Sequence, residues 1–194
     1  MRVHRIALAV FLFAATLSAQ ISPELDAGNQ RFRRGALLFA GLNELRVDLV
    51  ADQKPKITIL SCADSRVPPE LVFDQTLGDI FVVRVAGNVS DTFSMASLKY
   101  AKSHRYTGTL VVLGHQNCGA VKEAMKPESE WPDDADLRAL LTRIRTAIGN
   151  EQDFATAVKI NARKSAQALQ NQLDVPVIAA YYDMSTGKVT RLSP

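Results

Sequence analysis

The sequences ITILSCADSRVPPE (residues 57–70) and TLVVLGHQNCG (residues 109–119) share one pattern: an uncharged run of residues that favour β-strands is followed directly by polar and thiol side chains. Short runs without charge are typical of strands buried on both faces of a parallel sheet. In open α/β sheets, ligands bind at the carboxyl ends of such strands. The two stretches therefore predict a parallel sheet whose carboxyl edge carries Cys62, His115 and Cys118.

The rest of the chain predicts helices on both sides of this sheet. Residues 80–85 form a third apolar run, and residues 90–104 have helical spacing before the strand at 109–113, which is the βαβ pattern. We expect further helices at 22–48 (one or two), 70–73, 120–125, 135–148 and 153–173, a last strand at 175–182 and a hairpin turn at 185–188. The predicted fold class is α/β: a mainly parallel β-sheet flanked by helices, in one domain.

The first 19 residues resemble a secretory signal peptide. Arg2 and Arg5 form a basic start, residues 6–17 are almost wholly apolar, and small residues precede a cleavage point after Ala19. The apolar stretch is short for a membrane span, which favours a cleaved signal over the alternative, an uncleaved anchor. We therefore expect a domain at residues 20–194 that is exported, periplasmic or secreted, and not attached to a membrane after cleavage.

Charge argues against nucleic acid as a partner. Removing the first 19 residues takes away two of the 23 basic residues and none of the 20 acidic ones, so the mature net charge is +1. Proteins that bind nucleic acid present clustered Lys and Arg, and no such cluster is visible in this sequence.

Two thiols and one imidazole at one sheet edge predict a zinc site. Cys62, His115 and Cys118 would supply three ligands, with the fourth position open. A disulfide between Cys62 and Cys118 is the alternative in an exported protein. A structural disulfide has no use for a His-x-x-Cys cluster, nor for the charged Asp64 and Arg66 after Cys62. The pattern favours one Zn²⁺ per chain.

Asp64 and Arg66 are predicted to assist the metal. Asp64 lies two residues after Cys62, where its carboxylate can accept a hydrogen bond from zinc-bound hydroxide, and Arg66 can hold it bidentately in its ionised form. The same carboxylate can instead swing onto the metal and close the site, so we expect activity to fall at lower pH. An ordinary loop ion pair is the alternative interpretation.

These stretches resemble the two signatures of the β-class carbonic anhydrases. Residues 62–68 (CADSRVP) and 114–119 (GHQNCG) are similar to the signatures themselves, residues 78–84 (GDIFVVR) to the stretch between them, and residues 177–189 to the last strand and turn. The resemblance implies zinc on Cys62, His115 and Cys118 beside an Asp64–Arg66 pair. It also implies four residues that bind substrate: Gln53, Phe81, Tyr100 and Gly119.

The implied reaction is the hydration of carbon dioxide to bicarbonate and a proton, through attack by zinc hydroxide. Gln53 and the backbone N–H of Gly119 would bind substrate, and Phe81 and Tyr100 would come from a partner subunit, which implies a homodimer or a dimer of dimers. Val85 and Lys99 depart from the family pattern, where Asn and an acidic residue are usual.

Three other functions fit parts of the pattern. The chain could be a structural zinc module without catalysis, although such a module has no need of Gln53, Asp64 and Arg66. It could carry a Cys62/Cys118 redox pair, which predicts reactive thiols and no metal. Within the family resemblance, it could hydrolyse a related small substrate such as carbon disulfide.

Overall fold

The computed structural model describes residues 20–38 and 42–193, and the predicted signal peptide at 1–19 lies outside these ranges. One five-stranded sheet has the order β2-β1-β3-β4-β5. The first four strands of this order are mutually parallel, and β5 pairs antiparallel with β4. The strands are β1 (Ile57–Ser61), β2 (Ile80–Arg84), β3 (Thr109–His115), β4 (Val177–Asp183) and β5 (Lys188–Arg191).

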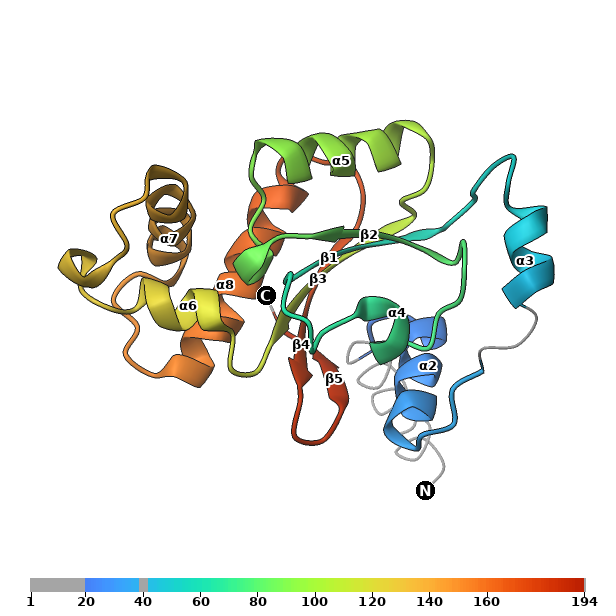
Figure 1. Cartoon of the computed structure of the whole chain (residues 1–194), viewed down its shortest axis with the longest axis horizontal. Coiled ribbons are helices and arrows are strands. Elements are labelled where there is room, and N and C mark those ends of the chain that lie inside the picture. The colour runs from blue at the N-terminus through green and yellow to red at the C-terminus, as the bar shows by residue number, and fades with distance from the viewer. Residues whose placement is uncertain (1–19, 39–41, 194) are drawn as a thin grey trace, which may run out of the picture.

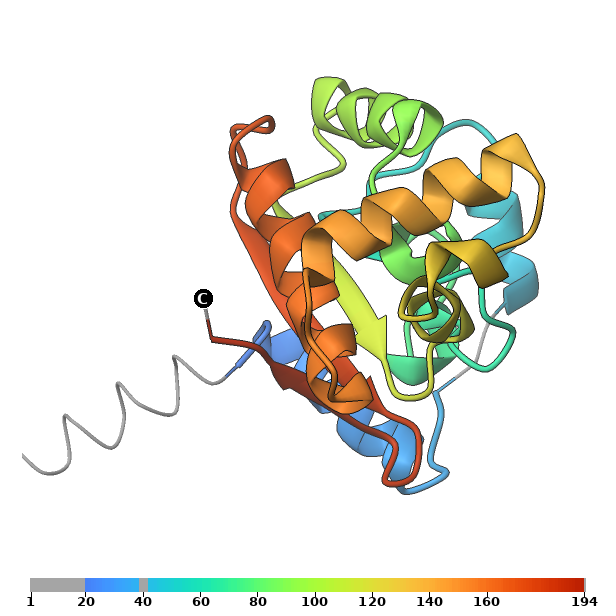
Figure 2. The ribbon, with the colours of Figure 1, turned by 90° about the vertical axis from the view of Figure 1, so that its left-hand side faces the viewer.

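Helices cover both faces of the sheet (Figure 1). Residues of α2 and α4 pack on one face, and residues of α5 and α8 pack on the other, while α6 and α7 contact each other and α8 at one end of the molecule (Figure 2). The described helices are α2 (Pro23–Arg33), α3 (Leu42–Asp48), α4 (Pro69–Val72), α5 (Thr92–Ser103), α6 (Gly119–Ala124), α7 (Ala135–Ile148) and α8 (Phe154–Gln170). There are also two 3-10 turns in the described ranges: η1 (Ala86–Asn88) lies between β2 and α5, and η2 (Glu128–Glu130) lies between α6 and α7. The predicted fold class is confirmed.

Capping side chains explain where several helices begin. The Ser22 hydroxyl accepts a hydrogen bond from the N–H of Leu25 at 3.2 Å, and Pro23 opens α2, as the sequence predicts. The helix expected from residue 90 begins at Thr92, because Asp91 is the N-cap and forms a capping box with Ser94. Between the helices expected at 120–125 and 135–148, the chain forms a short 3-10 turn at Glu128–Glu130.

The central strand β1 is buried along its whole length, which confirms the interpretation of its uncharged run. β5 was not predicted as a strand. It forms because the Asp183 carboxylate accepts hydrogen bonds from the N–H groups of Ser185 and Thr186, which closes the turn and pairs Asp183 with Lys188.

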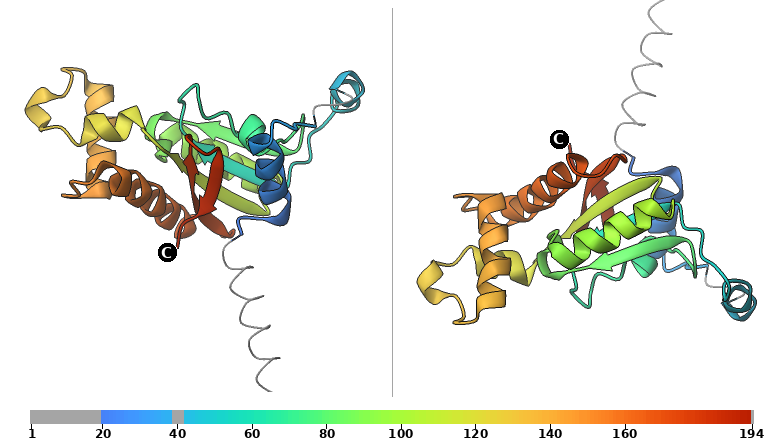
Figure 3. Two further views of the ribbon diagram at one scale, coloured as in Figure 1. Left: turned by 90° about the horizontal axis from the view of Figure 1, so that it is seen from below. Right: turned by 90° about the horizontal axis from the view of Figure 1, so that it is seen from above.

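α3 stands away from the sheet (Figure 3). It has no buried residue, and its apolar side chains face solvent within this chain; Val47 is 61% exposed. No helix among the described residues is long and apolar enough to cross a membrane.

Asn29 connects α2 to the opposite end of the chain. Its buried Nδ2 donates to the carbonyl groups of Val72 (3.0 Å) and Gly187 (2.8 Å), and its Oδ1 accepts from the N–H of Val189 at 2.9 Å. We predict that Asn29→Ala lowers the free energy of unfolding by about 2–3 kcal/mol, because three backbone groups lose their partner. Urea unfolding measures this loss, and a change below about 0.5 kcal/mol, the range of ordinary surface substitutions, would contradict it.

Candidate metal centre

Three potential metal ligands meet at the carboxyl edge of the sheet. Cys62 follows β1, His115 is the last residue of β3, and Cys118 is the N-cap of α6. Because β1 and β3 pair with Ser61 opposite Leu113, their ends lie side by side. The two Sγ atoms and an imidazole nitrogen all lie within 4.8 Å of one another, and all three residues are buried.

The His115 imidazole is oriented as a metal ligand requires. Its Nδ1 lies 2.9 Å from the carbonyl oxygen of Gln116, which can only accept, so Nδ1 carries the proton and donates. Nε2 then has a free lone pair, and it is buried without a hydrogen-bond partner in the described part of the chain. A buried lone pair aimed at two thiols is an unsatisfied acceptor that a metal ion would satisfy.

The two thiols differ in their tendency to ionise. A hydrogen bond with Cys118 is the main cause that lowers the pKa of Cys62 to about 4, and His115 and the N–H of Gly87 act in the same direction. The interaction with Cys62, together with burial, raises the pKa of Cys118. Ionisation of Cys62 thus opposes ionisation of Cys118, and a cation bound between the two sulfurs would favour both thiolates. Two thiolates and one imidazole are the donors that zinc prefers, so these residues fit this metal.

Asp64 and Arg66 form a bidentate ion pair beside the cluster. Arg66 Nε donates to Asp64 Oδ1 at 2.9 Å, and Arg66 Nη2 donates to Oδ2 at 2.7 Å. Arg66 Nη2 also reaches the carbonyl oxygen of Asn117 at 3.3 Å, which connects the two loops of the site. Hydrogen bonds from Arg66 hold the pKa of Asp64 well below its usual range. Asp64 is thus engaged with Arg66, and its predicted closed-state role as a ligand stays a prediction.

Two further residues, for which the sequence predicts no role, support the Cys62 loop. Arg84, at the end of β2, donates from Nε to the carbonyl oxygen of Cys62 at 3.0 Å and from Nη2 to that of Asp64 at 2.6 Å. Gly87 donates its N–H to Cys62 Sγ at 3.3 Å. One pattern in the sequence indicates these residues: the apolar run at 80–85 is followed directly by Ala-Gly-Asn. Because β2 is parallel to β1 and β3, this break lies at the same edge of the sheet as the three potential ligands.

The predicted substrate residues divide into two groups. Gly119 follows Cys118 and has open space around its Cα. The other three lie toward the opposite end of the sheet. Gln53 precedes β1, whereas Cys62 follows it; Phe81 pairs with Thr58 near the start of β1; and the Tyr100 ring lies 6.3 Å from that of Phe81. One chain therefore does not bring Gln53, Phe81 and Tyr100 to the cysteine–histidine cluster.

The two departures from the family pattern occupy different settings. Val85 is half-buried and packs against the apolar cluster that contains Cys62 and Cys118, and its N–H donates to the carbonyl oxygen of Ser61 at 3.0 Å. Lys99 is exposed on α5 beside Tyr100.

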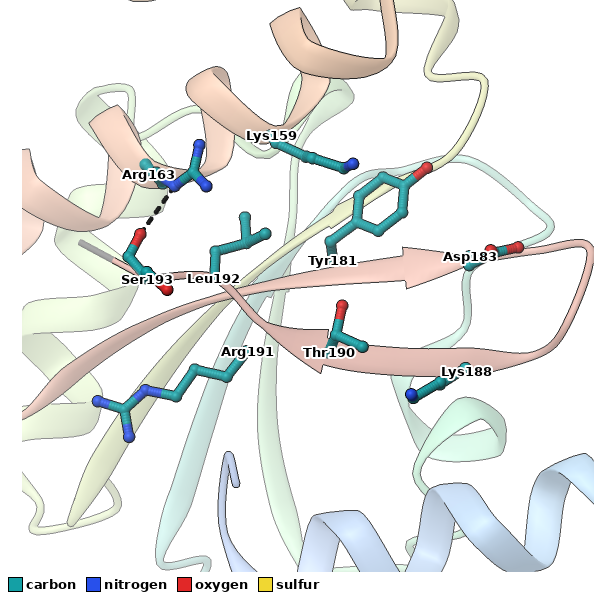
Figure 4. A pocket seen from close by; sticks show the side chains of 9 residues that line it. All are labelled: Lys159, Arg163, Tyr181, Asp183, Lys188, Thr190, Arg191, Leu192 and Ser193. Atoms are coloured by element: carbon teal, nitrogen blue, oxygen red, sulfur yellow. Dashed lines mark hydrogen bonds between the residues drawn. The ribbon is translucent and has the colours of Figure 1, made fainter. Parts of the chain in front are cut away.

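A basic hollow of about 340 Å³ lies between α8 and the β4–β5 hairpin (Figure 4). Lys159 of α8 extends over the Tyr181 ring, with Nζ 5.0 Å from the ring centroid, and Arg163 donates to the carbonyl oxygen of Ser193. None of the three potential metal ligands lines this hollow, so it is separate from the metal centre.

The fold and the cluster together define a mainly parallel α/β protein with a cysteine–histidine cluster at its carboxyl edge that could hold a metal ion. The sequence model of the carbonic anhydrase family matches residues 57–174, and this chain belongs to that family. The match spans the strand before Cys62, the whole cluster, and the helices that follow it.

Individual relatives agree with this assignment. The chain is 46% identical over 102 residues to carbonic anhydrase 2 of Mycobacterium tuberculosis, which covers 52% of this chain and 49% of that protein. It is 40% identical over 127 residues to the carbonic anhydrase of Mycolicibacterium smegmatis, covering 64% and 61%. The matched region thus spans about half to three-fifths of these relatives.

Solved structures share the fold. A tetrameric β-carbonic anhydrase from Sordaria macrospora aligns with a TM-score of 0.69 over 96% of this chain and 98% of that one, at 20% sequence identity. At this identity the likeness concerns the fold, and it agrees with the mainly parallel sheet flanked by helices.

Proposed function

We propose that this protein catalyses the reversible hydration of carbon dioxide to bicarbonate and a proton, with one zinc ion held by Cys62, His115 and Cys118. The observation that carries the proposal is the buried cysteine–histidine cluster beside the Asp64–Arg66 ion pair, in a chain of the carbonic anhydrase family. Zinc held there would act as a Lewis acid that lowers the pKa of water toward about 7.

The protein's own groups would orient the reactants. The Asp64 carboxylate would accept a hydrogen bond from the attacking water and help to pass its proton outward, and Arg66 would keep this carboxylate ionised and in place. The N–H of Gly119 would donate to bicarbonate. In a closed state at lower pH, Asp64 would leave Arg66 and become the fourth metal ligand.

Stopped-flow hydration of carbon dioxide, with zinc counted per chain and pH varied, tests this function. We expect activity with about one zinc per chain. Full zinc without hydration would contradict the proposal and favour a structural zinc module, and hydrolysis of carbon disulfide without hydration would indicate the related substrate. Absence of zinc with a Cys62–Cys118 disulfide would favour the redox pair, although such a pair leaves the Nε2 of His115 without a partner.

We also propose that the protein is a homodimer or a dimer of dimers, with Gln53, Phe81 and Tyr100 reaching the partner's metal centre. The surfaces of α3 and α5 support this: Val47 is exposed on α3, and Phe93 and Tyr100 lie on one face of α5, 83% and 49% exposed. Such apolar exposure is typical of an interface.

Light scattering should therefore give at least twice the mass of one chain. Phe93→Glu should shift the protein toward the monomer, because a charge would be buried at the interface, and Leu137→Glu on the exposed side of α7 serves as the matched control. A fully active monomer would contradict the proposed assembly.

The amino-terminal pattern supports export of the mature chain, from residue 20, to the periplasm or the medium. Amino-terminal sequencing of the protein recovered from those fractions tests the cleavage after Ala19.

A further inference from the structure

We infer that Asn161 is a positioning residue of the metal centre: it holds the Gly87 loop so that the Gly87 N–H donates to the sulfur of Cys62. This inference rests on the proposed zinc site. Asn161 lies in the middle of α8 and is fully buried. Its Nδ2 donates to the carbonyl oxygen of Gly87 at 2.7 Å, and the N–H of the same glycine lies 3.3 Å from Cys62 Sγ.

α8 is held close to the ends of the strands. A Cβ placed on Gly114, the residue before His115, would lie 2.9 Å from the Cβ of Ala162 and 3.5 Å from the carbonyl oxygen of Val158. The missing side chain at Gly114 thus lets α8 approach β3 closely. At this distance the side chain of Asn161, one residue before Ala162, reaches the Gly87 loop. One helix therefore contacts the backbone beside two of the three potential ligands.

The Gly87 loop has a conformation that needs support. Gly87 has φ +68°, in the left-handed region, and a Cβ there would lie 2.6 Å from Ile144 Cδ1. The peptide group between Gly87 and Asn88 is held on both sides: its N–H donates to the carbonyl oxygen of Val85 at 2.8 Å, and its carbonyl oxygen accepts from Asn161. Holding this peptide group restricts the φ and ψ angles of Gly87. It thereby keeps the N–H of Gly87, which belongs to the preceding peptide group, directed at Cys62 Sγ.

The buried state of Asn161 favours a positioning role over simple packing. Its Oδ1 has no hydrogen-bond partner within the described ranges, and an unsatisfied buried polar atom costs about 1–3 kcal/mol. A small apolar residue would fill the same place without this cost. What the amide alone provides is the donor to Gly87.

The hydrogen bond from Gly87 changes the electron density on the thiolate of Cys62. An N–H donor withdraws electron density from sulfur, so a metal bound to that sulfur remains a stronger Lewis acid. This matters in a site with two thiolates, which donate more charge than two imidazoles. Partners of this kind, one step removed from the metal, typically change metal affinity or activity by about 10–100-fold when they are lost.

Cobalt substitution and zinc release test the inference in the full-length protein. In Asn161→Ala we expect the thiolate-to-cobalt charge-transfer band to move to lower energy, and zinc affinity, measured by competition with a chelator, to fall about 10–100-fold. Asn29→Ala is the matched control, because Asn29 is also a buried amide that bonds backbone groups, yet its partners are Val72, Gly187 and Val189 and none of the three potential ligands. It should lower stability and leave both metal readouts unchanged.

Asn161→Leu removes the same donor to Gly87 while keeping a side chain of similar size, and serves as the second variant if Asn161→Ala does not fold. Wild-type spectra and affinities in either folded variant would overturn the inference while leaving the proposed function intact. A wild-type protein that binds neither zinc nor cobalt would overturn both.

Discussion

His115→Ala should abolish both stoichiometric zinc binding and carbon dioxide hydration. In the proposed site His115 would supply the nitrogen ligand, with its ring oriented through Nδ1, and without a cation the ionisation of one thiol opposes that of the other. Loss of one of three protein ligands removes the basis of a stable catalytic site. Cys118→Ser, which is nearly isosteric, should have the same effect with less disturbance of packing.

His104→Ala is the matched control for this result. His104 is the exposed C-cap of α5, and its ring lies tilted against that of Tyr100 with 4.0 Å between the centroids. Its replacement should leave zinc at about one per chain, as the three-ligand site requires. Metal content by elemental analysis and stopped-flow hydration measure both variants. A His115→Ala protein that retains zinc and activity would refute the ligand assignment.

Arg66→Ala should lower hydration about 100-fold or more while zinc is retained, because Arg66 orients the Asp64 carboxylate and donates no hydrogen bond to Cys62, His115 or Cys118. The pH profile should also change. Arg66 holds the pKa of Asp64 below its usual range, so removing Arg66 raises that pKa. The carboxylate is then protonated at a higher pH, and the variant should lose its residual activity at a pH where the wild type still works.

Arg31→Ala is the corresponding control, since Arg31 also pairs with an aspartate, Asp74, but between α2 and α4. It should keep wild-type hydration and pH dependence. Full activity in Arg66→Ala with normal zinc content would remove Asp64 and Arg66 from the proposed mechanism.

Much of the fold followed from local patterns. The uncharged run before Cys62 predicted a doubly buried strand, and β1 is buried throughout; helix α7 has the predicted bounds of 135–148. Short-range chemistry also explains where the predictions were incomplete: the N-cap at Asp91 moved the start of α5, and hydrogen bonds to Asp183 close the predicted hairpin turn so that the unpredicted strand β5 pairs with β4. These depend on single side-chain contacts, which periodicity does not contain.

The candidate site shows the same division. Cys62, His115 and Cys118 were predictable because each follows or ends a strand of one parallel sheet. The roles of Gly87 and Asn161 were not predictable, because they depend on how closely α8 approaches Gly114. Asn161 and Gly87, which form a hydrogen bond, lie 74 residues apart in the sequence. The separation of Phe81 and Tyr100 from the cluster likewise depends on the register between β1 and β2, which cannot be read from the sequence.

The pairing of Ser61 with Leu113 also has a consequence for folding. A slip of one residue between β1 and β3 would turn every side chain of the slipped strand to the opposite face. Cys62 and His115 would then point apart, and the cysteine–histidine cluster would not form. A metal ion bound by all three residues of the cluster, as we propose, would therefore stabilise the correctly aligned chain over misaligned ones. The cluster would then check the alignment of two distant strands as well as provide a place for chemistry.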